Sequence, residues 1–246
     1  MFSQSLSSFF VSHQEVLWLT TLLLDLGFTL LLYRWFGVAG LQVAIATAIV
    51  LANLQGPKLT EVFGLETSLG VIFYSAIFFA TDILSENHGR DKANQAVMLG
   101  FVVSVIVVTM LSIGVLFQPS SNPDTAAFAA SVHGAFNTII NFSPRFVAGS
   151  LLAYLISQRL DVWVFHKVRQ LTRGRSLWLR NNVSTLTSQM VDTAIYSLIV
   201  WWGVVDLATA LKLGAAKYVF KLAIALIDTP FLYLARRMRP PRTAPQ

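Results

Sequence analysis

The sequence predicts an all-α integral membrane protein, a bundle of about seven transmembrane helices, and its composition carries this prediction. Hydrophobic residues make up 55% of the 246-residue chain and charged residues only 12%, and the mean hydropathy is +0.63. Soluble domains contain roughly 25% charged residues, and half that share cannot cover a surface that faces water. We therefore expect the outer surface to face lipid.

Long uncharged stretches give the expected helices. A bilayer is crossed by about 20 apolar residues, and no charge occurs between Lys92 and Asp124, where residues 96–117 form the clearest span. The apolar runs are about twice as long as a barrel strand and lack strand alternation, which disfavours a β-barrel. The expected helices are 15–35, 38–55, 67–86, 94–117, 140–164, 183–205 and 215–235.

Basic residues gather in connections that these helices place on one side of the membrane. Half of the lysines and arginines lie in 166–180 and 236–242, whereas 118–136 has no basic residue. The positive-inside rule then predicts a multi-pass protein of the cell inner membrane with a cytoplasmic C-terminus and an outside N-terminus. On the cytoplasmic side we place Arg34, Arg90, Lys92, Lys167, Arg169, Arg173, Arg175, Arg180, Arg236, Arg237, Arg239 and Arg242, and on the opposite side Lys58 and Lys212.

Several classes of function are excluded or disfavoured by what the sequence lacks. It contains no cysteine, its four histidines are scattered, and it has no phosphate-binding loop or Ser-His-Asp order. We therefore expect no cofactor, no metal and no enzymatic activity. The high isoelectric point, about 9.8, does not predict a nucleic-acid partner, because the basic residues lie where topology requires them.

Ionisable residues within the expected spans are the candidates for a site. Each costs at least about 2.5–3.5 kcal/mol to insert, so a function is the first hypothesis for it. The candidates are Asp25, Asp82, Asp192, Lys221 and Asp228, with Arg145, Gln158 and Asp161 nearer helix ends.

Two helices carry polar residues along one face. In 67–86, Asp82 follows Ser75 and Phe78 at helical spacing, and it is predicted to be functional, whereas Glu86 is expected to pair with Arg90. In 183–205 the positions i, i+4 and i+8 are polar, with an amide beside them, which favours a ligand or proton site over simple helix packing. These residues are Ser184, Ser188, Asp192 and Gln189.

The last helix carries both signs of charge on one face. Lys217, Lys221 and Asp228 are spaced by 4 and 7 residues, and a structural ion pair of Lys221 with Asp228 or with Asp192 stays open. Pro230 is expected to break or kink this helix, as in transporters whose broken helices line the substrate site.

The remaining candidates also have structural interpretations. Arg145 could pair with an acidic neighbour, anchor a helix end or bind a substrate. The small residues Ser150, Ala153 and Ser157 form a ridge typical of helix packing, which would allow a homodimer. Asp25 has no polar neighbour one turn away, and we interpret it as structural.

Four blocks in order resemble the queuosine precursor transporter family, formerly described as vitamin uptake transporters. They run from about Ala44 to Arg237 and include LANLQGPKLTEVFGLETSLGVIFYSAIFFATDILSENHGRDKA, SPRFVAGSLLAYLISQRLDVWVFHKVR, LWLRNNVSTLTSQMVDTAIYS and YVFKLAIALIDTPFLYLARR. The resemblance implies import of the 7-deazapurine bases 7-cyano-7-deazaguanine and 7-aminomethyl-7-deazaguanine for tRNA queuosine modification. It maps the family's motif residues onto Asn53, Thr81, Asp82, Arg145, Gln158, Asp161, Asn182, Ser184, Gln189, Asp192, Lys221 and Asp228.

The implied ligand fits such residues. A carboxylate of Asp82 or Asp192 could accept the N–H edge of a deazaguanine, and Gln158, Gln189 or Asn53 could donate to its carbonyl. The flat base could stack on an aromatic ring, for which the candidates are Phe78, Tyr196 and Phe220.

The resemblance also implies a domain plan. Compact family members have six helices, so residues 1–36 are expected to add one N-terminal helix to a core at 37–236, followed by a disordered tail at 237–246. The fold is distantly similar, as an analogy, to substrate-binding subunits of energy-coupling-factor transporters. A transporter of another heterocycle such as a vitamin or nucleobase, a subunit that needs a separate ATPase, and a membrane enzyme remain alternatives, and proton coupling is allowed.

Overall fold

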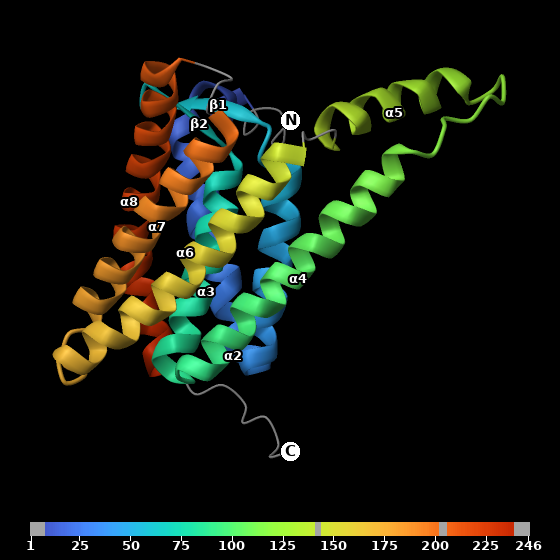
Figure 1. The fold of residues 1–246 in the computed structure, drawn as a ribbon. Coiled ribbons are helices and arrows are strands. Elements are labelled where there is room, and N and C mark those ends of the chain that lie inside the picture. Colours follow the sequence, from blue (N-terminus) through green and yellow to red (C-terminus); the bar gives the residue numbers. More distant parts are fainter. Residues whose placement is uncertain (1–7, 141–143, 202–205, 239–246) are drawn as a thin grey trace.

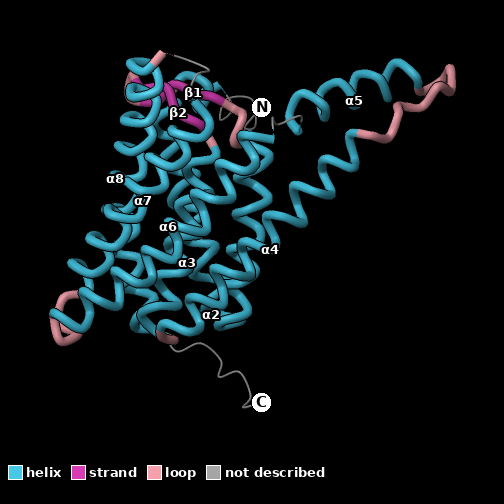
Figure 2. Tube along the Cα trace, in the orientation of Figure 1, coloured by secondary structure: helices cyan, strands magenta, loops and turns pink. Residues whose placement is uncertain are grey.

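The computed structural model describes residues 8–140, 144–201 and 206–238, and most of them are helical (Figure 1). The predicted all-α membrane bundle is confirmed, with one small β-hairpin added (Figure 2). The elements are α2 (Gln14–Gln55), β1 (Leu59–Val62), β2 (Leu65–Ser68), α3 (Gly70–Asn87), α4 (Arg90–Val115), α5 (Ala126–Ile140), α6 (Pro144–Leu171), α7 (Leu177–Trp201) and α8 (Leu207–Arg237).

The element α2 consists of two antiparallel helices joined at Gly37. This glycine has φ 59° and ψ −133°, a conformation open essentially only to glycine. Before it, the Trp18 ring contacts Phe63 in the β-hairpin, and Tyr33 contacts His88 at the opposite end of the bundle. The chain therefore reverses at Gly37, which confirms the separate predicted helices 15–35 and 38–55.

The β-hairpin after α2 was not predicted. Strands β1 and β2 pair antiparallel from Leu59 with Ser68 to Val62 with Leu65, and Phe63 and Gly64 form the turn with positive φ. Each strand has four residues, too few for an alternation that sequence analysis would register.

We call this side of the bundle the hairpin end. The basic end is the side that holds the α3–α4 and α6–α7 connections and the last turn of α8.

The segment 118–136 was predicted as a loop, but its second half belongs to helix α5. This helix packs on α4 and lies outside the main body of the bundle, to the right in Figure 1. It is apolar but has only 15 residues, too few to cross a bilayer. The following helix, α6, extends to Leu171, beyond the predicted end at 164.

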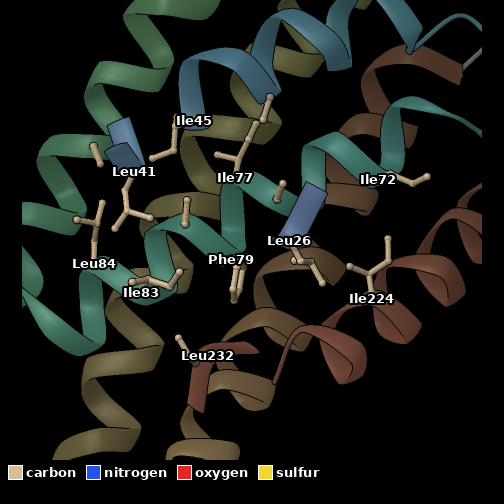
Figure 3. Close-up of a cluster of buried hydrophobic side chains, with 14 of the residues drawn as sticks. Leu26, Leu41, Ile45, Ile72, Ile77, Phe79, Ile83, Leu84, Ile224 and Leu232 are labelled. Carbon is tan, nitrogen blue, oxygen red and sulfur yellow. The ribbon is translucent and has the colours of Figure 1, made fainter. Parts of the chain in front are cut away.

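Helix α3 lies at the centre of the bundle. Every residue from Gly70 to Glu86 except Tyr74 is buried. In Figure 3, Ile77 and Phe79 of this helix pack between Ile45 of α2 and Leu232 of α8. The helices around α3 therefore hold its polar residues away from lipid.

Three elements, α2, residues 90–116 and α8, are long and apolar enough to cross a membrane by composition alone. Their outer faces expose large apolar side chains such as Phe28, Ile106 and Leu226, which suits contact with lipid. Helices α3, α6 and α7 carry polar side chains that the bundle buries. The chain is a multi-pass membrane protein.

Helix α8 runs without interruption through Pro230 to Arg237. Of the two outcomes predicted for Pro230, a break or a kink, the structure contradicts the break. Proline removes the donor to the carbonyl of Leu226, but both residues lie on the exposed face. On the buried face the Thr229 hydroxyl donates to the Ala225 carbonyl at 2.9 Å, and Asn181 of α7 holds both Asp228 and Thr229.

Candidate functional site

Buried polar side chains of α3, α6, α7 and α8 form a column through the interior of the bundle. We divide it into three layers by their position along α3: an outer layer at Tyr74, a middle layer at Asp82 and an inner layer at Glu86. The outer layer faces the hairpin end and the inner layer the basic end. At 1.5 Å per helical residue, the outer and middle layers are about 12 Å apart and the middle and inner layers about 6 Å apart.

The outer layer is built around Asp192 of α7. One carboxylate oxygen accepts hydrogen bonds from the Tyr74 hydroxyl at 2.9 Å and from the Ser157 hydroxyl at 3.3 Å, and the other pairs with the Lys221 ammonium. Three helices thus donate to one buried carboxylate of the fourth. Of the two ion pairs that the sequence left open, the structure contains Lys221–Asp192.

A cavity of about 120 Å³ opens beside this layer, on the side of the β-hairpin. Its wall combines aromatic rings, an amide, a carboxylate and an ammonium. Lys217 lies at its edge with its nitrogen 3.6 Å from the centroid of the Tyr196 ring. The polar and aromatic residues of the wall are Asn53, Ser68, Tyr74, Ser104, Ser150, Tyr154, Asp192, Tyr196 and Lys217.

Two wall residues are held by neighbours. The Tyr154 hydroxyl donates to the Val97 carbonyl of α4 at 3.2 Å, and the Asn53 amide donates to the Ile49 carbonyl at 2.8 Å. Such apolar cavities with a few convergent polar groups are the usual form of a small-molecule site.

The middle layer contains three carboxyl groups. Asp82 of α3 and Asp161 of α6 interact side chain to side chain, and Asp228 of α8 lies nearby. Two of them accept hydrogen bonds from neutral hydroxyl groups. Thr185 donates to Asp82 at 3.4 Å, and Ser188 donates to Asp161 at 2.8 Å. The cavity wall does not include these carboxyl groups.

The inner layer is an ion pair between Glu86 and Arg180. The guanidinium of Arg180 donates to both oxygens of Glu86 at 2.6–3.0 Å, and Arg236 approaches at 3.2 Å. The prediction that Glu86 pairs with Arg90 is wrong, because Arg90 is exposed in the first turn of α4. The buried Arg180 reaches Glu86 from α7, a contact that sequence spacing cannot show.

At the basic end, His88 connects α3 to α4. Its Nε2 lies 3.1 Å from the Tyr33 hydroxyl. Burial and the nearby Lys92 lower the pKa of His88, which favours the neutral ring.

The predicted site residues divide between the cavity and the column. Asn53 and Asp192 line the cavity, and Lys221 lies behind Asp192. The middle layer holds Asp82, Gln158, Asp161, Ser184 and Asp228, with Gln158 accepting a hydrogen bond from Thr81 at 3.1 Å. Gln189 is buried with no partner for its side-chain carbonyl among the described residues, and the side chain of Arg145, in the first turn of α6, lies outside them.

Sequence reasoning missed part of the cavity wall. Of the three proposed stacking residues only Tyr196 lines the cavity; Phe78 and Phe220 are not part of its wall. The wall includes Tyr74 and Lys217, which were not among the predicted binding residues. Helical spacing could have found both, because Tyr74 lies two turns before Asp82, and Lys217 one turn before Lys221.

Comparisons with known proteins agree with the resemblance. The sequence profile of a family described as "Putative vitamin uptake transporter" matches residues 68–235. A "Probable queuosine precursor transporter" of Bacillus subtilis (strain 168) is 38% identical over 91% of this chain and 95% of its own. A "Queuosine precursor transporter" of Escherichia coli (strain K12) is 28% identical over 68% of this chain and 71% of its own. No solved structure matches.

Proposed function

Because the chain belongs to the queuosine precursor transporter family, we propose that it imports 7-deazapurine bases, 7-cyano-7-deazaguanine and 7-aminomethyl-7-deazaguanine, across the membrane. It is a transporter rather than an enzyme. The observation that carries the substrate proposal is the cavity at the outer layer, which joins aromatic walls with an amide, a carboxylate and an ammonium inside an apolar bundle. A flat heterocycle with a hydrogen-bonding edge suits such a wall.

The contacts of Asp192 limit how a base can bind there. A carboxylate has about four lone-pair positions, and Tyr74, Ser157 and Lys221 occupy three of them. One position remains for an N–H of the base. We propose that Asp192 accepts this N–H, that Asn53 and Lys217 serve the polar substituents, and that the base packs on Tyr196.

Thermal stabilisation of the detergent-purified protein tests the substrate class. A ligand that binds the native state raises its stability by RT ln(1 + [L]/Kd). We expect 7-cyano-7-deazaguanine to raise the melting temperature, and guanine and a panel of vitamins to have little effect. A shift only with a vitamin or nucleobase would instead support the alternative that this scaffold carries another heterocycle.

Substitution of Asn53 by Ala tests the site within that assay. Asn53 lies at the cavity wall without an ion pair, so its truncation leaves the column intact. We expect the unliganded melting temperature to change little and the ligand-induced shift to fall. Glu61→Ala, on an exposed strand position of the hairpin, is the control and should keep the full shift.

We propose the inner membrane as the location, with the basic end in the cytoplasm. Arg169, Arg173, Arg175, Arg236 and Arg237 gather at this end, as the positive-inside rule requires. The N-terminus of α2 lies at the opposite, outer side. We further propose that import is coupled to proton entry.

We also propose a homodimer. Helix α5 lies beside the main body and exposes Phe128 and Val132, an apolar surface that a second copy could cover. The small-residue ridge proposed for dimer contacts is already used within the chain, because Ala153 and Ser157 are buried inside it. Light scattering of the protein in detergent would give the mass of two chains, and the mass of one chain would refute the dimer.

A further inference from the structure

The middle layer of the column differs from the layers on either side of it in charge. In the outer layer Asp192 has Lys221, and in the inner layer Glu86 has Arg180 and Arg236. Within the described part of the chain, no ammonium or guanidinium group forms an ion pair with Asp82, Asp161 or Asp228. The middle layer therefore concentrates buried carboxyl groups that have no cation beside them.

The basic groups on the packed helices are engaged elsewhere. Arg169 of α6 donates to the backbone carbonyls of Ser85 and Glu86, Arg180 of α7 binds Glu86, and Lys221 of α8 binds Asp192. Lys217 lies above Tyr196 at the cavity. The groups that interact with Asp82 and Asp161 are thus carboxyl and hydroxyl groups, from Asp228, Thr185, Ser184 and Ser188.

Asp82 and Asp161 each leave one oxygen unused. Both side chains are buried, with 1% and 0% of their surfaces exposed. Oδ1 of Asp82 and Oδ2 of Asp161 are buried and have no hydrogen-bond partner in the part of the chain that the structure describes. The side-chain N–H group of Gln158, on the same turn of α6 as Asp161, also has none.

Two neighbouring carboxylates that interact in a buried layer are not both expected to stay ionised. Their repulsion is large in a low-dielectric interior, and one proton between them removes it and supplies an O–H···O hydrogen bond. Among the described residues, no group of three or more His, Cys, Asp or Glu side chains is placed to hold a metal ion. A proton is therefore the ligand that this layer fits.

We propose that Asp82 and Asp161 form a proton-binding site, separate from the substrate cavity, that carries one proton inward with each imported base. The proton comes from water outside, binds one oxygen of the pair, and leaves to water in the cytoplasm. No covalent bond to the substrate forms or breaks. This inference rests on the proposed transport function, which it deepens by assigning the coupling site.

Helices α6 and α7 link this pair to the cavity by reciprocal hydrogen bonds. Ser157 of α6 donates to Asp192 of α7, and one turn further Ser188 of α7 donates to Asp161 of α6. A shift of one helix against the other changes both contacts together. Binding at Asp192 and protonation at Asp161 therefore both act on the same contact between α6 and α7.

Uptake into proteoliposomes tests the proposal. The membrane potential is clamped at zero and 7-cyano-7-deazaguanine, an uncharged base, is added outside. With one proton per base, a gradient of one pH unit, acid outside, supports about tenfold accumulation, because one unit equals about 1.4 kcal/mol. We expect this accumulation, and acidification of the lumen when the base is added, for the unsubstituted protein.

Asp82→Asn and Asp161→Asn, each tested alone, should still be stabilised by the base in the thermal assay. They should equilibrate it to a ratio of about one whatever the pH gradient. Asp25→Asn is the matched control, because Asp25 is a half-buried carboxyl of α2 outside the column, and it should accumulate the base like the unsubstituted protein.

The outcomes separate the two proposals. No thermal shift of the unsubstituted protein with the base would refute the transport proposal itself. A thermal shift together with uptake that ignores the pH gradient, or that follows a sodium gradient instead, would refute only the proton site. Gradient-driven accumulation by both aspartate variants would also overturn it.

If a variant does not fold, infrared spectra of the unsubstituted protein decide. A protonated carboxyl that loses its proton when the outer pH is raised in the presence of the base supports the pair. Carboxyl bands that stay unchanged by pH and base refute it.

Discussion

Arg180 shows what a buried charge requires of its surroundings. Its side chain is 1% exposed and its guanidinium meets both oxygens of Glu86, with the Phe165 ring 5.6 Å away. Breaking a buried pair by removing one partner costs about 3–5 kcal/mol, because the remaining charge stays buried. Arg236 still contacts Glu86, so we expect Arg180→Ala to lower the free energy of unfolding by about 3 kcal/mol, the lower end of this range.

The measurement is thermal unfolding in detergent. Arg175→Ala, in the exposed connection after α6, is the control and should unfold at nearly the native temperature. If the two variants melted together, the pair with Glu86 would contribute no net stability.

Single residues of the site were predictable only as far as helical spacing reaches. The stripe of Ser184, Ser188 and Asp192 is buried as predicted, because positions i, i+4 and i+8 share a face. Partner choice was not predictable, since Glu86 meets an arginine 94 positions away in the sequence. Periodicity reports which face of a helix is buried but says nothing about which neighbouring helix covers it.

The reversal within α2 depends on one residue. Gly37 has a positive φ and a ψ that an L side chain avoids, so we expect Gly37→Ala to lower the free energy of unfolding by about 1–3 kcal/mol. Gly27, in the first of the two helices, has no atom within 4 Å of an added Cβ, so Gly27→Ala should not be destabilising. Chemical denaturation of both variants in detergent checks this, and equal midpoints would contradict the strained reversal.

Elements were predictable where apolar length alone decides. The spans and their order follow from uncharged runs of about 20 residues, and the structure keeps them. The hairpin at 59–68 escaped prediction because its four-residue strands mix charged and apolar residues, and α5 because 15 apolar residues are too few for a span. Pro230 does not break α8, where the neighbouring Thr229 bonds to the Ala225 carbonyl and Asn181 of α7 bonds to Asp228 and Thr229.

At the scale of the whole molecule, charge is divided between the two ends and the middle of the bundle. Arginines collect at the basic end, the outer and inner layers of the column hold ion pairs, and the middle layer holds carboxyl groups without a cation among the described residues. Each such ionisable group costs free energy to insert into a membrane. The arrangement is consistent with the proposed movement of a base and a proton between the two ends.

The absence of cysteine from the sequence makes this arrangement directly testable by single-cysteine labelling. Ser68 lines the cavity at the hairpin end, Glu61 lies exposed on the same hairpin, and Arg175 is exposed at the basic end. With the basic end in the cytoplasm, a membrane-impermeant maleimide added to intact cells should label Glu61→Cys and Ser68→Cys. Arg175→Cys should react only after the cells are permeabilised.

Added 7-cyano-7-deazaguanine should then slow the labelling of Ser68→Cys but not of Glu61→Cys, because only Ser68 belongs to the cavity wall. Labelling of Arg175→Cys in intact cells would reverse the orientation. Equal effects of the base on the two hairpin positions would remove the substrate from this cavity, since a ligand bound there must shield its wall and leave the exposed strand free.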